Sequence, residues 1–294
     1  MPLFSVVIPA YNRREMLIRA IESVLSQDFI DYELIVVDDG STDGTDSIES
    51  MYRGKIRYIY QQNAGVSSAR NRGISASSSP WIALLDSDDT WHSSKLRRNT
   101  DYIRNNSSVK IHQSEDIWVR NGRRVNPGMK HLKKEGYIFS ESLKLCMISP
   151  SSVVFSREIT EKYGLFDEDL PACEDYDIWL RLTPFEYIGL IREKLITRYA
   201  GHSDQLSSNY PVMDRFRIYS IMKLLSASGE LLSHKQAGEA ATAAIEKARI
   251  LLAGSIKRGN SRNSSILEGI ISSLKHGSYT KTDYQSLLQL QNHP

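Results

Sequence analysis

Short apolar runs alternate with segments of helical periodicity along the first 92 residues of the chain. Four apolar runs rich in β-branched residues predict strands, at residues 4–9, 32–38, 56–61 and 81–85. Apolar residues at three- and four-residue spacing predict a helix over Met16–Leu25, and Gly65–Ala76 predicts another. Because nearly continuous apolar strands alternate with helices, the pattern predicts an α/β fold with a parallel sheet covered on both faces.

Polar side chains follow three of these strands at the point where each strand ends. Tyr11 follows the first strand, Asp39 the second, and the acidic segment Asp86–Asp89 the fourth. In sheets of this type, ligands bind in the crevice beyond the carboxyl ends of the strands. We therefore expect these side chains to lie around one crevice.

The acidic segment carries three carboxylates within four residues, those of Asp86, Asp88 and Asp89. Carboxylates this close repel one another unless a cation lies between them. Mg²⁺ and Mn²⁺ prefer oxygen ligands, and Mg²⁺ typically binds through one or two carboxylates together with substrate phosphates. The segment therefore indicates a metal that bridges a diphosphate. A solvated acidic turn is the alternative, because the pattern is short.

The loop after the first strand lacks the usual phosphate-binding signatures. Its residues, Pro9-Ala10-Tyr11-Asn12-Arg13, form neither the dinucleotide-binding Gly-x-Gly-x-x-Gly nor a P-loop. They also lack the glycine-rich, arginine-containing loop of sugar-nucleotide pyrophosphorylases. Phosphates must be held by other residues, and the acidic segment with a metal is the available candidate.

Several blocks of sequence have the order and spacing of a known family. Four of them lie within about residues 4–92: Ser5–Asn12, Val36–Asp43, Asn63–Gly73 and Leu84–Asp89. Ala172–Arg181 is a fifth block, and Arg198–Ser203 is a candidate sixth. Together these blocks resemble the family 2 inverting glycosyltransferases of the GT-A fold, of the bacterial surface-glycan type, in which the fifth block corresponds to the Glu-Asp segment near the acceptor. The resemblance implies a mostly parallel sheet with helices on both faces.

The resemblance also implies which residues bind the nucleotide and the donor sugar. They are Pro9, Ala10, Tyr11, Asn12, Asp39, Arg70, Asn71, Asp86 and Ser87. Tyr11 would lie against the base, with capping of the sheet as its alternative, and Asp39 would accept a hydrogen bond from the base. Asp38 is instead expected to be a structural acceptor in the following turn. Arg70 and Arg72 cannot share a helix face, so one of them is expected to be a surface charge.

The metal ligands and the general base follow from the same resemblance. Asp88 is the first candidate ligand for Mn²⁺ or Mg²⁺ and Asp89 the second. His202 completes the metal shell, contacts a phosphate or is a surface histidine. Asp175 is implied as the general base. Glu174 and Asp177 compete with it, and favourable charge at a helix start is the alternative role for one or two of these acids.

The middle of the chain is expected to bind the acceptor. Val109–Arg120 predicts a strand that turns through Asn121 and Gly122 into a second strand. Glu174, Trp118 and Trp179 are weaker acceptor candidates, and either tryptophan could belong to the core instead. The basic stretch that contains Lys130, Lys133 and Lys134 is either a solvated loop or a contact for the phosphate of a lipid-linked acceptor.

The last part of the chain is predicted to be helical. An alanine-rich amphipathic helix spans about residues 240–252, and weaker helical patterns follow at 261–274 and 282–290. Two roles are open for this helical extension. One is a packed bundle or homodimer surface; the other is contact with an anionic membrane surface through a modest excess of Lys and Arg.

Composition and charge narrow the picture further. The 294 residues carry a net charge of +2, which provides no argument for nucleic-acid binding. Two cysteines, Cys146 and Cys173, lack metal-ligand spacing and fit a reducing compartment. No signal peptide and no apolar stretch of membrane-spanning length are evident. We therefore expect a cytoplasmic protein, with peripheral contact at the inner face of the plasma membrane as an alternative.

Together with these patterns, the family resemblance implies a metal-dependent inverting glycosyltransferase of the hexosyltransferase type. Residues 1–212 would form the GT-A domain, with a nucleotide-binding half at 1–92 and an acceptor-binding half at 93–212, and residues 213–294 the helical extension. The enzyme would move a sugar from a nucleotide donor, with UDP favoured, to a hydroxyl of a glycan or lipid-linked acceptor. A nucleotidyltransferase and a non-catalytic sugar-nucleotide or glycan-binding module are the alternatives.

Overall fold

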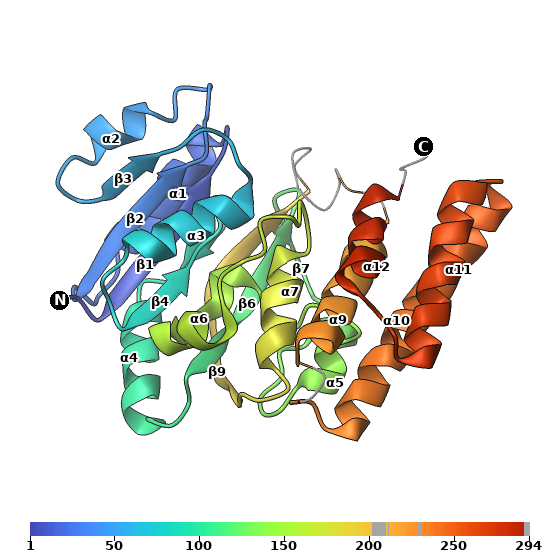
Figure 1. The fold of residues 1–294 in the computed structure, drawn as a ribbon. Helices are drawn as coiled ribbons and strands as arrows, with labels where there is room; N and C mark the ends of the chain where they lie inside the picture. Colours follow the sequence, from blue (N-terminus) through green and yellow to red (C-terminus); the bar gives the residue numbers. More distant parts are fainter. Residues whose placement is uncertain (202–209, 211, 229–230, 291–294) are drawn as a thin grey trace. The chain divides into compact units, whose positions relative to one another are not determined.

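The computed structural model describes residues 1–201, 210, 212–228 and 231–290 of the chain (Figure 1). By their internal contacts, the residues divide into two compact units. The sheet unit comprises residues 1–137, 147–171 and 185–202; the helical unit comprises 138–146, 172–184 and 203–294. The domain boundary at residue 212 stays a prediction, and the contacts assign two earlier segments to the helical unit.

Nine strands of the described residues form one sheet in the sheet unit. The strands are β1 (Phe4–Ala10), β2 (Tyr32–Asp38), β3 (Arg57–Tyr60), β4 (Trp81–Leu84), β5 (Thr90–Trp91), β6 (Ile111–Arg120), β7 (Arg123–Val125), β8 (Val153–Ser156) and β9 (Ile188–Ala200). Their order is β3-β2-β1-β4-β8-β6-β9-β5, with β7 paired to β6. The four strands predicted in the first 92 residues are confirmed.

The direction of the strands changes in the middle of the sheet. β1 pairs in parallel with β2 and β4, and β2 pairs in parallel with β3, as predicted for the N-terminal part. β8 then pairs antiparallel with both β4 and β6, while β6 and β9 are parallel. The α/β fold is confirmed, and the sheet as a whole is mixed.

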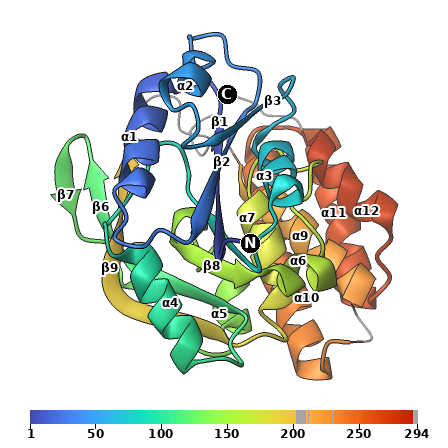
Figure 2. The ribbon, with the colours of Figure 1, turned by 90° about the vertical axis from the view of Figure 1, so that its left-hand side faces the viewer.

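Helices cover both faces of the parallel strands, as predicted. Val36 of β2 belongs to the same core cluster as the buried side chains of α1 (Arg14–Leu25). Its neighbour Val37 points to the other face and packs with Ala69 of α3 (Val66–Ala76). Figure 2 shows α1 and α3 on opposite sides of β1 and β2. The remaining helices of this unit are α2 (Ser47–Met51), α4 (Lys95–Asn105) and α6 (Arg157–Tyr163), with short 3₁₀ turns at Met129–His131 and Pro150–Ser152.

The predicted hairpin in the middle region is confirmed. β6 turns through Asn121 and Gly122 into β7, and both turn residues have positive φ, 50° and 73°. Asparagine and glycine tolerate this conformation better than other residues do, which is why the pair signals a tight hairpin.

The helical unit contains the helices predicted after residue 212. Its elements are α5 (Phe139–Ser142), α7 (Glu174–Leu182), α9 (Asp214–Ser228), α10 (His234–Lys257), α11 (Ser261–His276), α12 (Lys281–Ser286) and a 3₁₀ turn at Leu287–Gln289. A capping box of Ser233 and Gln236 starts α10, and its small buried face includes Ala240 and Ala244. Within the described part of the chain, no helix is long and apolar enough to cross a membrane.

Candidate active site

The structure brings together the loops that follow β1, β2 and β4. The Asp39 N–H donates to the Ala10 carbonyl at 2.8 Å. The Asn12 N–H donates to Ser41 Oγ at 2.9 Å, and Asn12 Oδ1 accepts from the Thr42 N–H at 2.7 Å. Asn12 adopts a positive φ of 49°, which aims its side chain at the second loop. Arg13, also in the loop after β1, pairs with Asp88 after β4 at 2.9 Å. The convergence of strand ends that the sequence predicts is confirmed.

The residues from Pro9 to Tyr11 differ in exposure. Pro9 and Ala10 are buried at the end of β1, whereas the residue Tyr11 is 48% exposed. Tyr11 is therefore not a core residue. Contact between Tyr11 and a base stays a prediction.

Asp38 is a structural acceptor, as the sequence indicates. Its side chain is fully buried, and Oδ1 accepts a hydrogen bond from the Ser41 N–H at 2.9 Å. Oδ2 accepts a short hydrogen bond from the Tyr58 hydroxyl. Burial and this contact raise the pKa of Tyr58, which keeps its hydroxyl protonated as the donor.

Asp39 organises the turn that leads into α3. Its Oδ1 accepts from Gln61 Nε2 at 2.7 Å and from the Ala64 N–H at 2.9 Å. Its Oδ2 accepts from Asn63 Nδ2 at 3.2 Å and from the Gly65 N–H at 2.8 Å. Asp39 is 3% exposed, and each of its oxygens accepts two hydrogen bonds from the protein. The sequence does not reveal this role, and contact of Asp39 with a base stays a prediction.

Two arginines hold the first two carboxylates of the acidic segment. Arg70 Nη2 lies 2.7 Å from Asp86 Oδ1, and Arg13 Nη1 lies 2.9 Å from Asp88 Oδ2. Arg70 is 3% exposed whereas Arg72 is at the surface, which confirms that only one of the two arginines faces inward. The ion pair of Arg13 was not predicted from sequence, because its partner Asp88 lies 75 positions further along the chain.

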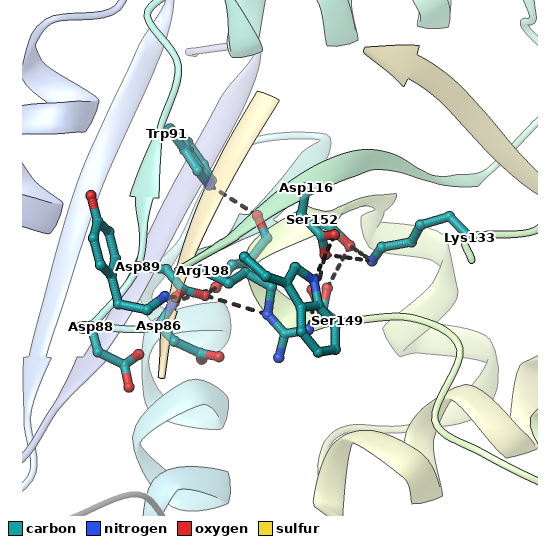
Figure 3. A network of polar contacts seen from close by, with 12 residues as sticks. Asp86, Asp88, Asp89, Trp91, Asp116, Lys133, Ser149, Ser152 and Arg198 are labelled. Atoms are coloured by element: carbon teal, nitrogen blue, oxygen red, sulfur yellow. Dashed lines mark hydrogen bonds and ion pairs between the residues drawn. The ribbon is translucent and has the colours of Figure 1, made fainter. Parts of the chain in front are cut away.

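The third carboxylate, that of Asp89, is buried in a polar network (Figure 3). Its Oδ2 accepts from Ser151 Oγ at 2.6 Å and its Oδ1 from the Tyr199 N–H at 3.0 Å. Ser151 Oγ also accepts from the Asp86 N–H at 3.1 Å, so one serine joins the two ends of the segment. Burial, followed by repulsion from Asp88, raises the pKa of Asp89 to about 8.

The network continues through charged residues of β6, β9 and the segment before α5. The Arg198 guanidinium lies 4.0 Å from Asp89 Oδ2 and 3.9 Å from Asp116 Oδ2. Lys133 Nζ lies 3.6 Å from Asp116 Oδ2 and donates to Ser152 Oγ at 2.8 Å. The Lys133 side chain is only 8% exposed, so it is neither the solvated charge nor the open phosphate contact that the sequence leaves as alternatives.

Of the predicted metal ligands, Asp88 fits an ion that binds together with a diphosphate. Among the described residues, no three His, Cys, Asp or Glu side chains are grouped to hold a metal by themselves. Asp88, whose side chain is 15% exposed, can supply one oxygen ligand, and phosphate oxygens commonly supply others. Both oxygens of Asp89 already accept hydrogen bonds. His202 lies outside the described residues.

Three acids lie in the first turn of α7 in the helical unit, and they differ in environment. Asp177 is 1% exposed and pairs with Arg181 at 3.0 Å and Lys223 at 3.4 Å. Glu174 is 5% exposed. Asp175 is the half-exposed one of the three. Exposure therefore favours Asp175 as the acid that can meet a substrate.

The contacts of Asp175 keep its carboxylate at the helix start. Its Oδ1 accepts from the Tyr176 N–H at 2.7 Å, and Cys146 Sγ donates to its Oδ2 at 3.4 Å. Cys173, just before α7, has a positive φ of 62°, a conformation that costs energy for residues other than glycine. Backbone of this kind is enriched at functional sites.

The remaining candidates divide between core and surface. Trp179 is 1% exposed, so of its two predicted roles the structure supports the core side chain and not a sugar contact. Trp118 is half-buried and donates from Nε1 to Asp116 Oδ1 at 2.8 Å. Asn71 donates to the Phe166 carbonyl at 2.9 Å and accepts from its N–H at 3.0 Å, and Ser87 is 4% exposed. Donor contacts of Asn71 and Ser87 stay predictions.

Comparison with known proteins gives a family match over more than half of the chain. The family model described as glycosyl transferase family 2 matches residues 5–164. Chondroitin synthase from Escherichia coli is 32% identical over 200 residues, which cover 65% of this chain and 28% of that protein. Uncharacterized glycosyltransferases of Rickettsia felis, Rickettsia prowazekii and Rickettsia bellii also match. The matching part spans 40%, 63% and 28% of their lengths, so these relatives extend beyond it.

Two solved structures share the fold. Residues 1–349 of Staphylococcus aureus TarS, in complex with UDP-GlcNAc, superpose with a TM-score of 0.62 at 19% identity, covering 96% of this chain and 93% of that one. The mannosyltransferase PcManGT from Pyrobaculum calidifontis, in complex with GDP-Man and Mn²⁺, gives a TM-score of 0.57 at 15% identity, covering 98% and 85%. At these identities the likeness concerns the fold.

Proposed function

Because the chain belongs to glycosyl transferase family 2 and is a glycosyltransferase, we propose that it transfers a sugar with inversion from a nucleoside diphosphate donor to an acceptor hydroxyl. The observation that carries this proposal is the acidic segment at the end of β4. There, Asp86 and Asp88 lie within ion-pair distance of arginines from the two neighbouring elements. Such a cluster suits a diphosphate with a cation.

The donor is proposed to be a UDP-sugar, bound at the ends of β1, β2 and β4. The exposed position of Tyr11 supports stacking against a base. The mostly buried Arg70 guanidinium, held by Asp86, suits contact with the diphosphate or the donor sugar. The two solved structures with this fold hold UDP-GlcNAc and GDP-Man, which supports a sugar nucleotide of either base.

A divalent cation is proposed to bind through Asp88, with Asp89 and His202 as further candidates. When bound, Mn²⁺ or Mg²⁺ would neutralise the charge of the leaving diphosphate. PcManGT, which shares the fold, holds Mn²⁺ in its structure. Without the cation, Arg13 pairs with Asp88 at 2.9 Å, and Ser151 Oγ donates to Asp89 Oδ2 at 2.6 Å.

Asp175 is proposed as the general base. A carboxylate in this role takes the proton of the acceptor hydroxyl as its oxygen attacks the anomeric carbon. The half-exposed position of Asp175 supports the choice, because Asp177 is buried in ion pairs. The acceptor is proposed to be a hydroxyl of a glycan or of a lipid-linked saccharide.

Incubation of the chain with Mn²⁺, a panel of UDP- and GDP-sugars and glycan acceptors tests the proposal. We expect release of a nucleoside diphosphate that depends on acceptor, and a product of opposite anomeric configuration by NMR. A nucleotidyltransferase would form or consume pyrophosphate instead. A non-catalytic module would bind the nucleotide sugar without turnover.

The organisation around this activity is also a proposal. We propose that residues 1–212 carry the transfer reaction, that 213–294 serve as a packing or homodimer surface, and that the protein acts in the cytoplasm. Size-exclusion chromatography with light scattering tests the homodimer. A truncation after residue 212 that retains transfer would support the boundary.

A further inference from the structure

The helical unit contains a buried cation that no carboxylate of the described residues neutralises. Arg215, in the first turn of α9, is 5% exposed. Its Nη1 donates to the Leu290 carbonyl at 2.5 Å, and its Nε is buried without a hydrogen-bond partner. The next arginine on the same helix, Arg217, pairs with Asp214 at 2.9 Å. Asp214, the acid that precedes Arg215 in the chain, thus pairs with other cations, those of Arg217 and Lys247.

The ring of Phe216, whose centroid lies 4.5 Å from the Arg215 guanidinium carbon, offsets part of the cost of burying this charge. No carboxylate of the described residues offsets the rest, and burial lowers the pKa of Arg215. Arginine nevertheless keeps its proton in proteins. The positive charge therefore remains inside the helical unit. Binding of an anion to Arg215 would compensate this buried charge.

Arg215 lines a hollow that has the composition of an anion site. A second guanidinium, that of Arg258, lines the same hollow, together with the polar side chains of Ser255 and Asn263. No acidic residue is among its described lining residues. Arg258 follows the last turn of α10, and its guanidinium lies over Gly254, where an added Cβ would come within 3.1 Å of Nη2. The missing side chain of this glycine leaves room for Arg258 beside the hollow.

We propose that this hollow binds a phosphate-type oxyanion, either free or as part of a larger molecule. Guanidinium groups pair with phosphate oxygens through two parallel hydrogen bonds, so Arg215 and Arg258 can hold such an anion from two helices. The hollow has a volume of only about 20 Å³, so the carbon-bearing part of a phosphate ester would lie outside it, on the side of the exposed Arg258. The site is separate from the proposed sugar transfer and does not depend on it.

Thermal unfolding of the full chain in potassium phosphate and in potassium chloride of equal ionic strength tests the site. We expect phosphate to raise Tm in a saturable way, by about 2–5 °C at concentrations well above Kd. Arg258 is exposed, so Arg258→Ala should fold normally, and we expect it to lose most of the phosphate-dependent rise in Tm. Arg215→Met is expected to lose this rise in Tm as well. Arg249→Ala, which removes an exposed positive charge from α10 outside the hollow, is the matched control and should keep it.

Co-sedimentation with vesicles distinguishes the sources of the phosphate. Binding to phosphatidic acid in phosphatidylcholine, but not to phosphatidylcholine alone, would identify a lipid headgroup if Arg258→Ala weakens it several-fold and Arg249→Ala does not. A saturable Tm rise without vesicle binding would identify a free anion. An equal effect of phosphate on Arg258→Ala and Arg249→Ala, or no effect on the wild type, would overturn the proposal.

Discussion

The guanidinium of Arg13 lies 2.9 Å from the carboxylate of Asp88, and so joins the loop after β1 to the acidic segment after β4. Both side chains are mostly buried, with 18% and 15% exposure. Asp88 is also the carboxylate that we propose as the first metal ligand. Arg13 and a divalent cation therefore compete for the same oxygens, and metal binding must weaken the ion pair.

Removal of Arg13 is accordingly expected to strengthen the binding of Mn²⁺ in the absence of nucleotide. A partly exposed ion pair is worth about 1 kcal/mol, so Arg13→Ala should bind Mn²⁺ about fivefold more tightly. Electron paramagnetic resonance of free Mn²⁺ measures this directly. Arg14→Ala removes the neighbouring arginine, which pairs with exposed Glu15, and should leave the affinity unchanged. Equal Mn²⁺ affinities for wild type and Arg13→Ala would argue against Asp88 as a ligand.

Asp39→Ala is expected to destabilise the fold as well as weaken UDP binding. Its carboxylate accepts four hydrogen bonds from residues 61–65, and truncation leaves these donors without their partner. The free energy of unfolding should fall by roughly 3 kcal/mol, and UDP affinity by about ten- to hundredfold. Denaturant unfolding and calorimetric titration measure the two effects. Asp46→Ala, at an exposed acid without a side-chain cap bond, is the control. A loss of stability with unchanged UDP affinity would limit Asp39 to the turn.

The four predicted strands and the strand-end site of the first 92 residues could be predicted because their signals are local. The carboxylates of Asp86 and Asp88 follow directly on a buried apolar run, and Gly65 precedes the periodic residues of α3. Parallel strands with short crossings then bring the loops to one edge. The role of Asp39 in the 61–65 turn needed the structure, because no short-range pattern links them.

The environment of Asp89 could not be predicted for a similar reason. Its partners Ser151 and Tyr199 lie 62 and 110 positions further along the chain. They reach Asp89 because β8 enters the sheet antiparallel between β4 and β6, and a reversal of this kind has no periodicity of its own. Burial of Lys133 is a further example, since a lysine-rich stretch usually indicates a solvated loop.

Lys95 provides a prediction about pH and stability. It is fully buried, its Nζ donates to the Ser152 carbonyl at 3.2 Å, and its charge lies 5.1 Å from the Trp91 ring. Burial, and then repulsion from Lys133, lowers its pKa from 10.5 to about 7. Between pH 7 and 10.5 the unfolded chain therefore holds a proton at this site that the folded chain lacks. The unfolding free energy contributed by Lys95 rises with pH in this window, and below pH 7 the cost of the buried charge is fully present.

Replacement of Lys95 by methionine removes this cost. Relative to the wild type, Lys95→Met should be most favourable below pH 7, and its advantage should decrease by on the order of 3 kcal/mol between pH 6 and pH 10. Urea unfolding across this pH range measures the difference. Lys110→Met, at a more exposed lysine that pairs with Glu158, should show no such trend. A pH-independent difference for Lys95→Met would mean that Lys95 keeps its ordinary pKa.

The acids of α7 lead to the prediction about the general base. Asp177 is held by two cations and Glu174 is buried, whereas Asp175 is half-exposed. Asp175→Asn keeps the shape of the side chain and its contact with the Tyr176 N–H while it removes the base. We expect transfer to fall by a factor on the order of 10²–10⁴, because a positioned general base contributes that much.

Binding measurements separate loss of the base from loss of the fold. Asp175→Asn should bind the donor and Mn²⁺ like the wild type and unfold at a similar temperature, so that kcat falls while donor affinity does not. Glu174→Gln is the neighbouring control and should retain most of the transfer. Cys146→Ser keeps a donor for Asp175 Oδ2, at present 3.4 Å from the thiol, and should also remain active. If Asp175→Asn were active and Glu174→Gln inactive, Glu174 would be the base, and the exposure of Asp175 would not be related to catalysis.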